Sequence, residues 1–414
     1  MAVKIVRQAK KIVLLGAPTS AAALSLGHEG APSAFRSAGL TEQLTSIGYE
    51  VTDFGDDPQQ IYKPDEESPR ARNLPAVVNA LEALKPRVEQ AVKSAALPII
   101  LGGDCSIALA VVAGTRRYFR RVGLIYMDRD ADLNTPATTR SGCVDGMAVS
   151  HLTGRGAAEL VRFWGEPPLV REPDLALFGI DRLDPSEEEV LRKSPLRSFT
   201  ADEIKRIGAG AAAKLALERI HANRSEFVLH FDVDVIADFR ATNYPGSGGL
   251  TLEDAREALH IFAQQKNLAA VELTAYNPLK DPDGSGARVI VDLIAGALEK
   301  RLEALTAAQI EPSGVEAPQS AIEESHSAQG QISSVKPPEP TRASTEVRSG
   351  ETWSSNSLEG VNTENGEKPD HTEGSPLSVA GHPEVDEVPK VAKTESQAAE
   401  NGSPLPEDSD ENTA

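Results

Sequence analysis

The sequence predicts an α/β protein whose core is a mostly parallel β-sheet with helices on both faces. Over the first 310 residues, apolar and β-branched runs alternate with amphipathic segments, which is typical of repeated β-α-β units. Right-handed crossovers between parallel strands distribute the helices over both faces of the sheet. Three of the apolar runs are followed directly by aspartate-rich segments, which indicates a polar site at one edge of that sheet.

The apolar runs predict seven strands, at residues 11–16, 49–54, 97–101, 122–127, 175–180, 227–231 and 269–273. Helices are expected between them, at residues 32–47, 73–95 and 106–119, after the loop 130–146 as far as about 164, and at the chain end of this region, at 286–305. Others begin at Asp184, which could cap its helix, at Thr200 and near Thr251.

Local signals set several helix ends. Gly48 is expected to end the helix at 32–47, and Asn73 to cap the helix at 73–95. Pro75 lies in the first turn of that helix, where a missing N–H costs nothing. Thr200 and Glu203 have the spacing of a capping box.

The last hundred residues differ in composition from the rest. Residues 311–414 hold 21 acidic and 6 basic residues, so they carry −15 of the formal charge of −20. They are rich in Pro, Ser, Glu, Gly and Asn, and Trp353 is almost their only aromatic residue. Such a segment buries too little apolar surface to offset its ordering entropy. We therefore predict one large domain at 1–310 and a disordered tail at 311–414, either a solvated appendage or a docking segment.

Composition also excludes several classes of protein. No apolar stretch approaches the roughly 20 residues of a membrane span, and residues 1–11 do not resemble a signal peptide. Only two cysteines occur, Cys105 and Cys143, which favours a reducing cytoplasm without disulfides. The acidic balance argues against nucleic acid, and the absence of a Gly-x-Gly-x-x-Gly motif against a dinucleotide cofactor.

The aspartates after the strands predict a metal site. Alternation places side chains on one face of an extended chain, and carboxylates at this density need protons or cations to neutralise them. A pair of divalent metal ions is the simplest solution. The alternative for each aspartate is a role in a turn or a helix cap. The candidate ligands are Cys105, Asp128, Asp130, Asp132, Asp232 and Asp234.

An ordered set of motifs resembles the arginase/agmatinase (ureohydrolase) family over residues 10–306. The motifs are Leu15-Gly16-Ala17-Pro18, Leu101-Gly102-Gly103-Asp104, Asp132-Leu133-Asn134-Thr135-Pro136, Ser141-Gly142, Gly146-Met147, Phe231-Asp232-Val233-Asp234, Gly248-Gly249-Leu250-Thr251 and Asn277-Pro278. The resemblance implies a three-layer α/β/α sandwich and two Mn²⁺ ions per chain, whose shared hydroxide attacks a guanidinium-type carbon. It also implies a homo-oligomer, a trimer or hexamer.

Compared with that family, four positions are changed. Where the family places histidine, this chain has Cys105, Asp130 and Asp145, and none of its eight histidines lies in a metal motif. Ala275 replaces the glutamate that holds the guanidinium, and Glu272 is too far along its strand, on the opposite side, to replace it. Arginine itself is therefore a doubtful substrate.

These changes alter the chemistry that we expect. Five carboxylates and a thiolate give up to six negative charges, against four positive charges from two divalent ions, which weakens the metals as Lewis acids. Arg129 either offsets one charge or, pointing away from its neighbours, faces solvent or has a structural role. Cys105 favours a softer metal such as Zn²⁺, Fe²⁺ or Co²⁺ at one position, or is a small buried residue that binds nothing. Mn²⁺ remains the prediction, on the resemblance.

The resemblance also implies an amino-acid pocket. It places groups for an α-carboxylate at Asn134, Thr139 and Ser141, and groups for an α-amino group at Asp184 and Glu187. Neutral donors suit a carboxylate and acidic groups suit an ammonium. The alternative for these residues is loop and helix capping.

Two residues have open roles. Asp145 is a candidate general acid or base, or else a helix N-cap before Gly146. Cys143 is expected to line the pocket without acting as a nucleophile, since no base is placed beside it.

The sequence thus predicts a metal-dependent hydrolase of carbon–nitrogen bonds in a guanidino or related amino acid, arginine-like or N-hydroxyarginine-like. The alternative is a non-catalytic binding or regulatory protein with the same fold.

Overall fold

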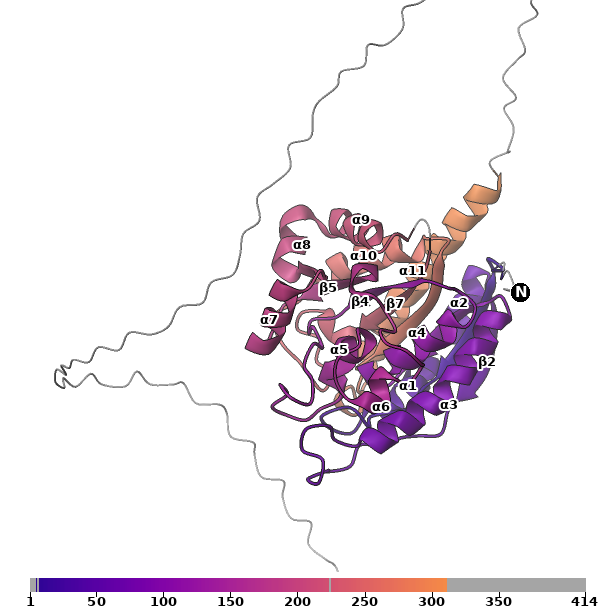
Figure 1. Cartoon of the computed structure of the whole chain (residues 1–414). Coiled ribbons are helices and arrows are strands. Elements are labelled where there is room, and N and C mark those ends of the chain that lie inside the picture. The colour runs from indigo at the N-terminus through magenta and orange to yellow at the C-terminus, as the bar shows by residue number, and fades with distance from the viewer. Residues whose placement is uncertain (1–4, 6, 223–224, 311–414) are drawn as a thin grey trace, which may run out of the picture. The chain divides into compact units, whose positions relative to one another are not determined.

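The core of the protein is one parallel β-sheet of eight strands covered by helices (Figure 1). The computed structural model describes residues 5, 7–222 and 225–310, without the side chains of residues 309 and 310. The strands are β1 (Lys11–Gly16), β2 (Glu50–Asp56), β3 (Leu97–Leu101), β4 (Val122–Met127), β5 (Leu175–Ile180), β6 (Arg197–Thr200), β7 (Glu226–Asp232) and β8 (Leu268–Thr274). The predicted three-layer α/β/α class is confirmed.

The strand order brings distant motifs together. Along the sheet it is β2-β1-β3-β8-β7-β4-β5-β6, and every neighbouring pair is parallel. The strands that precede the three aspartate-rich segments, β3, β7 and β4, are therefore close neighbours near the middle of the sheet. Because all strands run in the same direction, their carboxyl ends form one edge, where loops from both halves of the chain meet.

Two apolar cores separate the sheet from its helix layers. One core contains buried residues of α1 (Ala31–Ser37), α2 (Leu40–Ile47), α8 (Ala201–Ile207), α9 (Ala209–Arg219), α10 (Leu252–Ala263) and α11 (Ser285–Ile310). The other contains α3 (Leu74–Lys93), α4 (Ala108–Arg116), α5 (Ala148–Leu152) and α6 (Ala158–Val161), with α7 (Pro185–Lys193) packed against it. In Figure 1, α8, α9 and α10 lie above the sheet, and α3, α5 and α6 lie below it. Continuous apolar strands are what a sheet buried on both faces requires.

Most predicted elements are confirmed, and two differ. The four strands β1, β3, β4 and β5 have the predicted bounds, but β6 was not predicted. The helix expected at 32–47 is wrong: it divides into α1 and α2, because Gly39 takes a left-handed conformation with φ of 88°. Gly48 ends α2 with φ of 110°, as predicted.

The predicted caps are partly confirmed. The Thr200 and Thr251 hydroxyls accept hydrogen bonds from the third residue of their helices, and Asp184 occupies the N-cap position of α7. Asn73 occupies the predicted N-cap position of α3, but its side chain does not cap the helix. Its side-chain amide donates to the carbonyl of Lys63 instead, at 2.9 Å.

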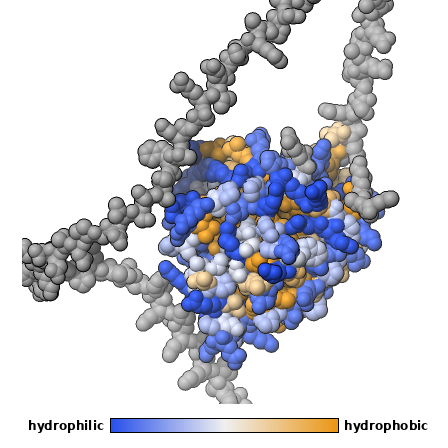
Figure 2. Space-filling model, in the orientation of Figure 1, coloured by the Kyte–Doolittle hydropathy of each residue, from blue (hydrophilic) through white to orange (hydrophobic). Residues whose placement is uncertain are grey.

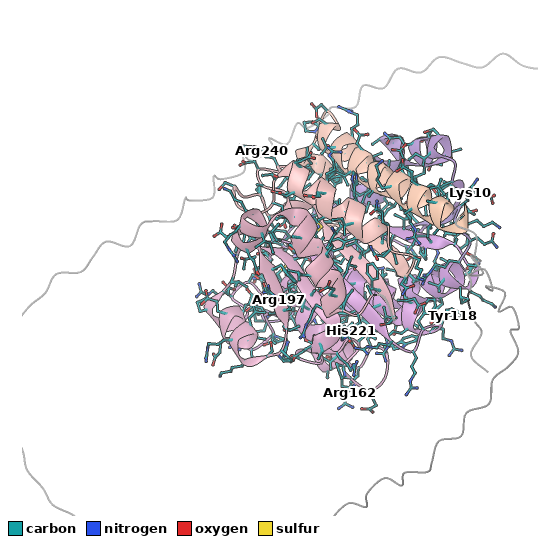
Figure 3. The ribbon with its side chains drawn as sticks, turned by 90° about the horizontal axis from the view of Figure 1, so that it is seen from above. Lys10, Tyr118, Arg162, Arg197, His221 and Arg240 are labelled. Atoms are coloured by element: carbon teal, nitrogen blue, oxygen red, sulfur yellow. The ribbon has the colours of Figure 1, made fainter. Side chains whose placement is uncertain are left out.

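The face of the described region that Figure 2 shows is mostly polar. Hydrophilic residues cover most of the face in Figure 2, with apolar residues scattered between them. In the view from above, Arg197 at the start of β6 and Lys10 next to β1 lie on opposite sides (Figure 3).

No helix of the described region combines the length and the apolar character that crossing a membrane requires. The predicted disordered tail, residues 311–414, lies outside the described residues.

Candidate functional site

A pocket opens at the carboxyl edge of the sheet, and nearly all the predicted site residues line it. They are Cys105, Asp128, Asp130, Asp132, Asn134, Ser141, Asp145, Asp184, Glu187, Asp232 and Asp234. Thr139 is the predicted site residue that does not line the pocket. Its hydroxyl accepts a hydrogen bond from the Gly142 N–H at 3.0 Å, so it shapes the loop on which Ser141 lies.

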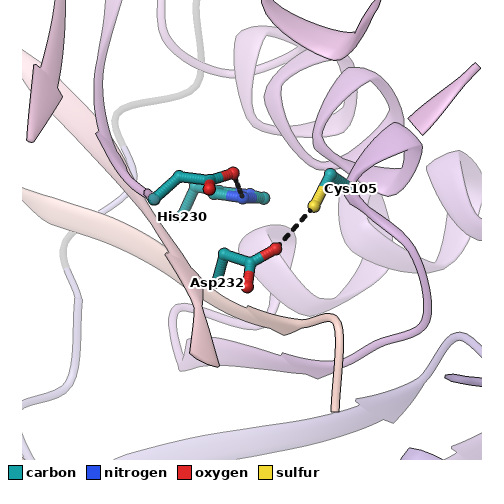
Figure 4. Close-up of side chains that lie close together, drawn as sticks. Cys105, His230 and Asp232 are labelled. Atoms are coloured by element: carbon teal, nitrogen blue, oxygen red, sulfur yellow. Dashed lines mark hydrogen bonds and ion pairs between the residues drawn. The ribbon is translucent and has the colours of Figure 1, made fainter. Parts of the chain in front are cut away.

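Four buried side chains from three strand ends form what we call the first group: Cys105, Asp128, His230 and Asp232. One possible ligand atom from each lies within 4.8 Å of the others. Cys105 begins a 3₁₀ turn after β3, and its Sγ lies 2.9 Å from Asp232 Oδ2 (Figure 4). His230 Nε2 lies 4.0 Å from Asp128 Oδ2.

His230 enters the site although it lies outside the sequence motifs. It lies two residues before Asp232 on β7, so both side chains point to the same face of the strand. Its Nδ1 lies 2.8 Å from Glu272 Oε1 on the adjacent strand β8, and its ring stacks on Tyr126 with centroids 3.9 Å apart. The imidazole is thus held on both sides, and its Nε2 lies 3.3 Å from the Thr274 hydroxyl, on the side of the Asp128 carboxylate.

Three carboxylates form what we call the second group: Asp128, Asp130 and Asp234, so Asp128 belongs to both groups. Arg182 binds Asp130 with two nitrogens, and its Nε lies 2.5 Å from Asp130 Oδ1. On the other side, Arg129 Nη2 lies 3.6 Å from Asp234 Oδ2. Arg129 is 2% exposed, so the expectation that it faces solvent is wrong. Its guanidinium also donates to the carbonyl of Tyr244, which holds the buried side chain in place.

The other acidic residues of the site are held by hydroxyl and backbone donors. Asp132 accepts a hydrogen bond from the Tyr126 hydroxyl. Asp145 accepts from the Cys105 N–H at 2.6 Å and from the Tyr244 hydroxyl at 2.7 Å. It makes no capping bond, so its interpretation as a helix N-cap is wrong. Asp145 instead connects the turn that carries Cys105 to the pocket wall.

Burial and mutual repulsion make this cluster a strong binder of positive charge. Burial, and then the neighbouring aspartates, raise the pKa of Asp128 and of Asp232 well above the ordinary value. The pKa of Asp234 rises to about 7, first through burial and then through Asp130, although Arg129 lowers it. Burial also raises the pKa of the Cys105 thiol. In the absence of a cation, protons would have to neutralise these groups.

The donor set of the first group fits a divalent metal. A thiol, an imidazole and two carboxylates are common ligands of divalent transition metals. In the second group, Asp234 Oδ1 is buried with no hydrogen-bond partner among the described residues, which also suits a cation. However, Arg182 already occupies both oxygens of Asp130, so the second group fits a metal less well.

The predicted amino-acid pocket adjoins these groups. Asn134 donates to Asp184 Oδ2 at 3.0 Å, which connects the loop after β4 to the start of α7. The two oxygens of Glu187 accept the N–H groups of Leu133 and Asp184, both at 2.9 Å. Neutral donors and acidic groups therefore lie side by side on one wall of the pocket.

Cys143 lines the same pocket but is not set up as a nucleophile. Its Sγ lies 2.9 Å from the carbonyl of Ala22 and 3.6 Å from the Tyr244 hydroxyl. Burial, and then Asp145, raise the pKa of this thiol, so it stays protonated.

Comparison with known proteins identifies the family. The family model described as "Arginase family" matches residues 10–299. The chain belongs to the arginase family. It is 32% identical to the arginase of Neurospora crassa over 305 residues, which cover 70% of this chain and 84% of that one. It is 30% identical to the arginase of Bacillus subtilis over 297 residues, 71% of this chain and 99% of that one. The native structure of the arginase from Bacillus caldovelox superposes with a TM-score of 0.64 at 29% identity, covering 71% of this chain and 98% of that one.

The arginase-family match includes all the candidate site residues, and the structure adds three that the sequence motifs did not indicate. His230 could have been found, because it alternates with Asp232 on the same strand. Arg182, two residues beyond β5, and Tyr244, on the loop before α10, line the pocket through tertiary folding and carry no local signal.

The motif glycine Gly103 offers a test of how tightly this site is packed. A Cβ at Gly103 would lie 2.7 Å from the carbonyl oxygens of Ala17 and Thr19, which are backbone atoms and cannot turn aside. Gly103→Ala is expected to reduce the free energy of unfolding by about 1–3 kcal/mol. Urea denaturation measures it, with Gly296→Ala in α11 as the control, since a Cβ there meets only the end of His260 at 3.6 Å. If Gly103→Ala left the free energy of unfolding unchanged, the turn would have to be able to shift by enough to accept the methyl group.

Proposed function

We propose that the chain is a metal-dependent hydrolase that cleaves a carbon–nitrogen bond of a guanidino or related amino acid. The observation that carries this proposal is the shared pocket. The carboxylates and the thiol of the two groups of metal-type donors line it, with His230 behind them, beside neutral donors and acidic groups suited to an amino acid. Membership of the arginase family supports the hydrolytic chemistry.

The pocket wall supplies the proposed recognition of the amino acid. Asn134 and Ser141 would donate to the α-carboxylate, with Thr139 holding their loop in shape. Asp184 would accept from the α-ammonium group. Both oxygens of Glu187 are already used by backbone N–H groups, so we assign it the positioning of Asp184 and of the loop after β4.

We propose the six predicted residues as metal ligands. The predicted ligands Cys105, Asp128, Asp130, Asp132, Asp232 and Asp234 all line the pocket, and family resemblance predicts two Mn²⁺ ions. A divalent cation bound there supplies Lewis-acid activation of water and of the scissile group. Asp145, held by the Cys105 N–H and the Tyr244 hydroxyl, is placed to hold or pass on a proton at its carboxylate.

The substrate test uses the full-length chain loaded with Mn²⁺ or Zn²⁺. Arginine, N-hydroxyarginine and agmatine are incubated with the protein, and urea-type products and the released amine are measured. We expect turnover of a substrate with an α-carboxylate and not of agmatine, which lacks one. Asp232→Asn is the inactive control. Binding of an amino acid in calorimetry, without any product, would replace this proposal by the non-catalytic binding protein.

The remaining expectations stay predictions. They are the domain boundary at residue 310 with a tail at 311–414, the homo-trimer or homo-hexamer, the cytoplasmic location and the absence of nucleic-acid binding.

A further inference from the structure

We propose that the chain binds one borderline divalent cation, such as Zn²⁺, Co²⁺ or Fe²⁺, in the first group, with His230 as a ligand. This inference rests on the proposed metal-dependent function and specifies its cofactor. It differs from the two Mn²⁺ ions that resemblance predicts. Four observations support it, and each concerns residues of this chain.

The first observation is the arrangement of the four donors. One atom each from Cys105, Asp128, His230 and Asp232 lies within 4.8 Å of the others, and all four side chains are buried. Metal bonds of about 2.0–2.3 Å in a tetrahedral site place donor atoms roughly 3.3–3.8 Å apart. The separations seen here, 2.9 Å from Cys105 Sγ to Asp232 Oδ2 and 4.0 Å from His230 Nε2 to Asp128 Oδ2, lie on either side of that range. Small side-chain rotations are enough to close the site.

The second observation is the support behind His230. His230 Nδ1 lies 2.8 Å from Glu272 Oε1, which leaves Nε2 as the ring nitrogen that can bind a cation in exchange for its contact with the Thr274 hydroxyl at 3.3 Å. A carboxylate behind a histidine is the usual arrangement for a metal-binding imidazole. Glu272 is fully buried, and its Oε2 has no partner among the described residues. Burying the carboxylate of Glu272 against His230 is costly unless a positive charge lies close by.

The third observation is the chemical character of the donors. Thiolate and imidazole ligands suit Zn²⁺, Co²⁺ and Fe²⁺, whereas Mn²⁺ and Mg²⁺ prefer sets made of oxygen. On binding, the Cys105 sulfur bonds to the cation and its proton leaves to solvent. The first group therefore selects a softer cation than a set of carboxylates does.

The fourth observation is the positive charge already present at the second group. Arg182 binds Asp130 with two nitrogens, and Arg129 lies 3.6 Å from Asp234. These two guanidinium groups already bring positive charge to two of the three carboxylates of the second group. A second cation would have to compete with them for Asp130 and Asp234, so we assign one cation to each chain.

The test is a titration of the metal-free, full-length protein with Co²⁺, followed by absorption spectroscopy. A thiolate bound to Co²⁺ gives a near-ultraviolet charge-transfer band, and we expect this band to saturate at one equivalent. Cys105→Ser should abolish the band, whereas Cys143→Ser, which changes the other pocket cysteine, should keep it. A band that survives in Cys105→Ser, or a wild-type protein without the band, overturns the proposal.

The histidine and the arginines are tested in the same assay. His230→Gln should weaken Co²⁺ binding strongly, and Glu272→Gln by about 10–100-fold, while His260→Gln, remote from the site, should not change it. Circular dichroism checks folding, and Glu272→Gln decides the question if His230→Gln does not fold. Arg182→Met should open the second group and raise the capacity to two equivalents. Unchanged affinity in Glu272→Gln, or two equivalents in the wild type, would contradict the proposal.

These measurements use no substrate, so they separate this inference from the proposed function. Co²⁺ binding as described, with no hydrolysis of any amino acid, would support the metal site and contradict the proposed hydrolase function. Hydrolysis that requires two Mn²⁺ ions would support the hydrolase function and contradict the proposal of a single borderline cation.

Discussion

Replacing Asp128 with asparagine is expected to abolish metal-dependent hydrolysis while leaving the fold intact. Asp128 is the one residue shared by the first and second groups, so its loss weakens any cation bound at either. A bound metal supplies several kcal/mol of stabilisation to the charge that develops in hydrolysis. Since 1.36 kcal/mol corresponds to a tenfold change in rate, we expect kcat/KM to fall by about 10³-fold or more.

The variant should remain folded because asparagine has the size of aspartate and relieves repulsion in the cluster. Asp128 accepts the Asp130 N–H at 2.7 Å, and the asparagine side-chain oxygen can accept the same bond. Metal content by mass spectrometry and turnover of the best substrate measure the effect. Asp202→Asn, on the exposed side of α8, is the matched control and should change neither quantity. If the Asp128→Asn protein kept its metal and its activity, neither group could be the metal site of the reaction.

Most of the sheet was predictable because its central strands are buried on both faces. Runs such as 97–101 and 122–127 contain no charged residue and are buried at every position, which is typical of a central parallel strand. β6 was missed for the opposite reason. It is a four-residue edge strand with the sequence Arg-Ser-Phe-Thr, and only Phe199 is buried. Its pairing with β5 depends on the neighbouring strand and not on its own pattern.

The site residues that lie directly at the end of a buried strand were predictable. Asp128 and Asp232 were found because each ends a buried strand, and strand ends share one edge. His230 was not predicted because it lies inside the apolar run 227–231, although it alternates with Asp232 and so shares its face of β7. Arg182 and Tyr244 could not be found in this way. Their positions depend on loop paths, and a single sequence does not determine these.

Removing the Glu187 side chain is expected to destabilise the protein by about 2–5 kcal/mol. Glu187 is 6% exposed, and its two oxygens accept the N–H groups of Leu133 and Asp184. Glu187→Ala leaves both donors without their partner, at about 1–3 kcal/mol for the buried Leu133 N–H and somewhat less for the part-buried N–H of Asp184. Urea denaturation measures the loss. Glu188→Ala, the exposed neighbour on the same helix, is the control and should stay within about 0.5 kcal/mol of the wild type.

Glu187→Gln distinguishes a structural role from direct contact with substrate. The glutamine keeps one acceptor oxygen, so it should recover about half of the lost stability. Because Glu187 fixes both the loop after β4 and the start of α7, the variant should also raise KM for an amino-acid substrate more than it lowers kcat. If Glu187→Ala were as stable as the wild type but lost all substrate affinity, its carboxylate would have to contact the ammonium group directly. The two backbone hydrogen bonds would then be incidental to its role.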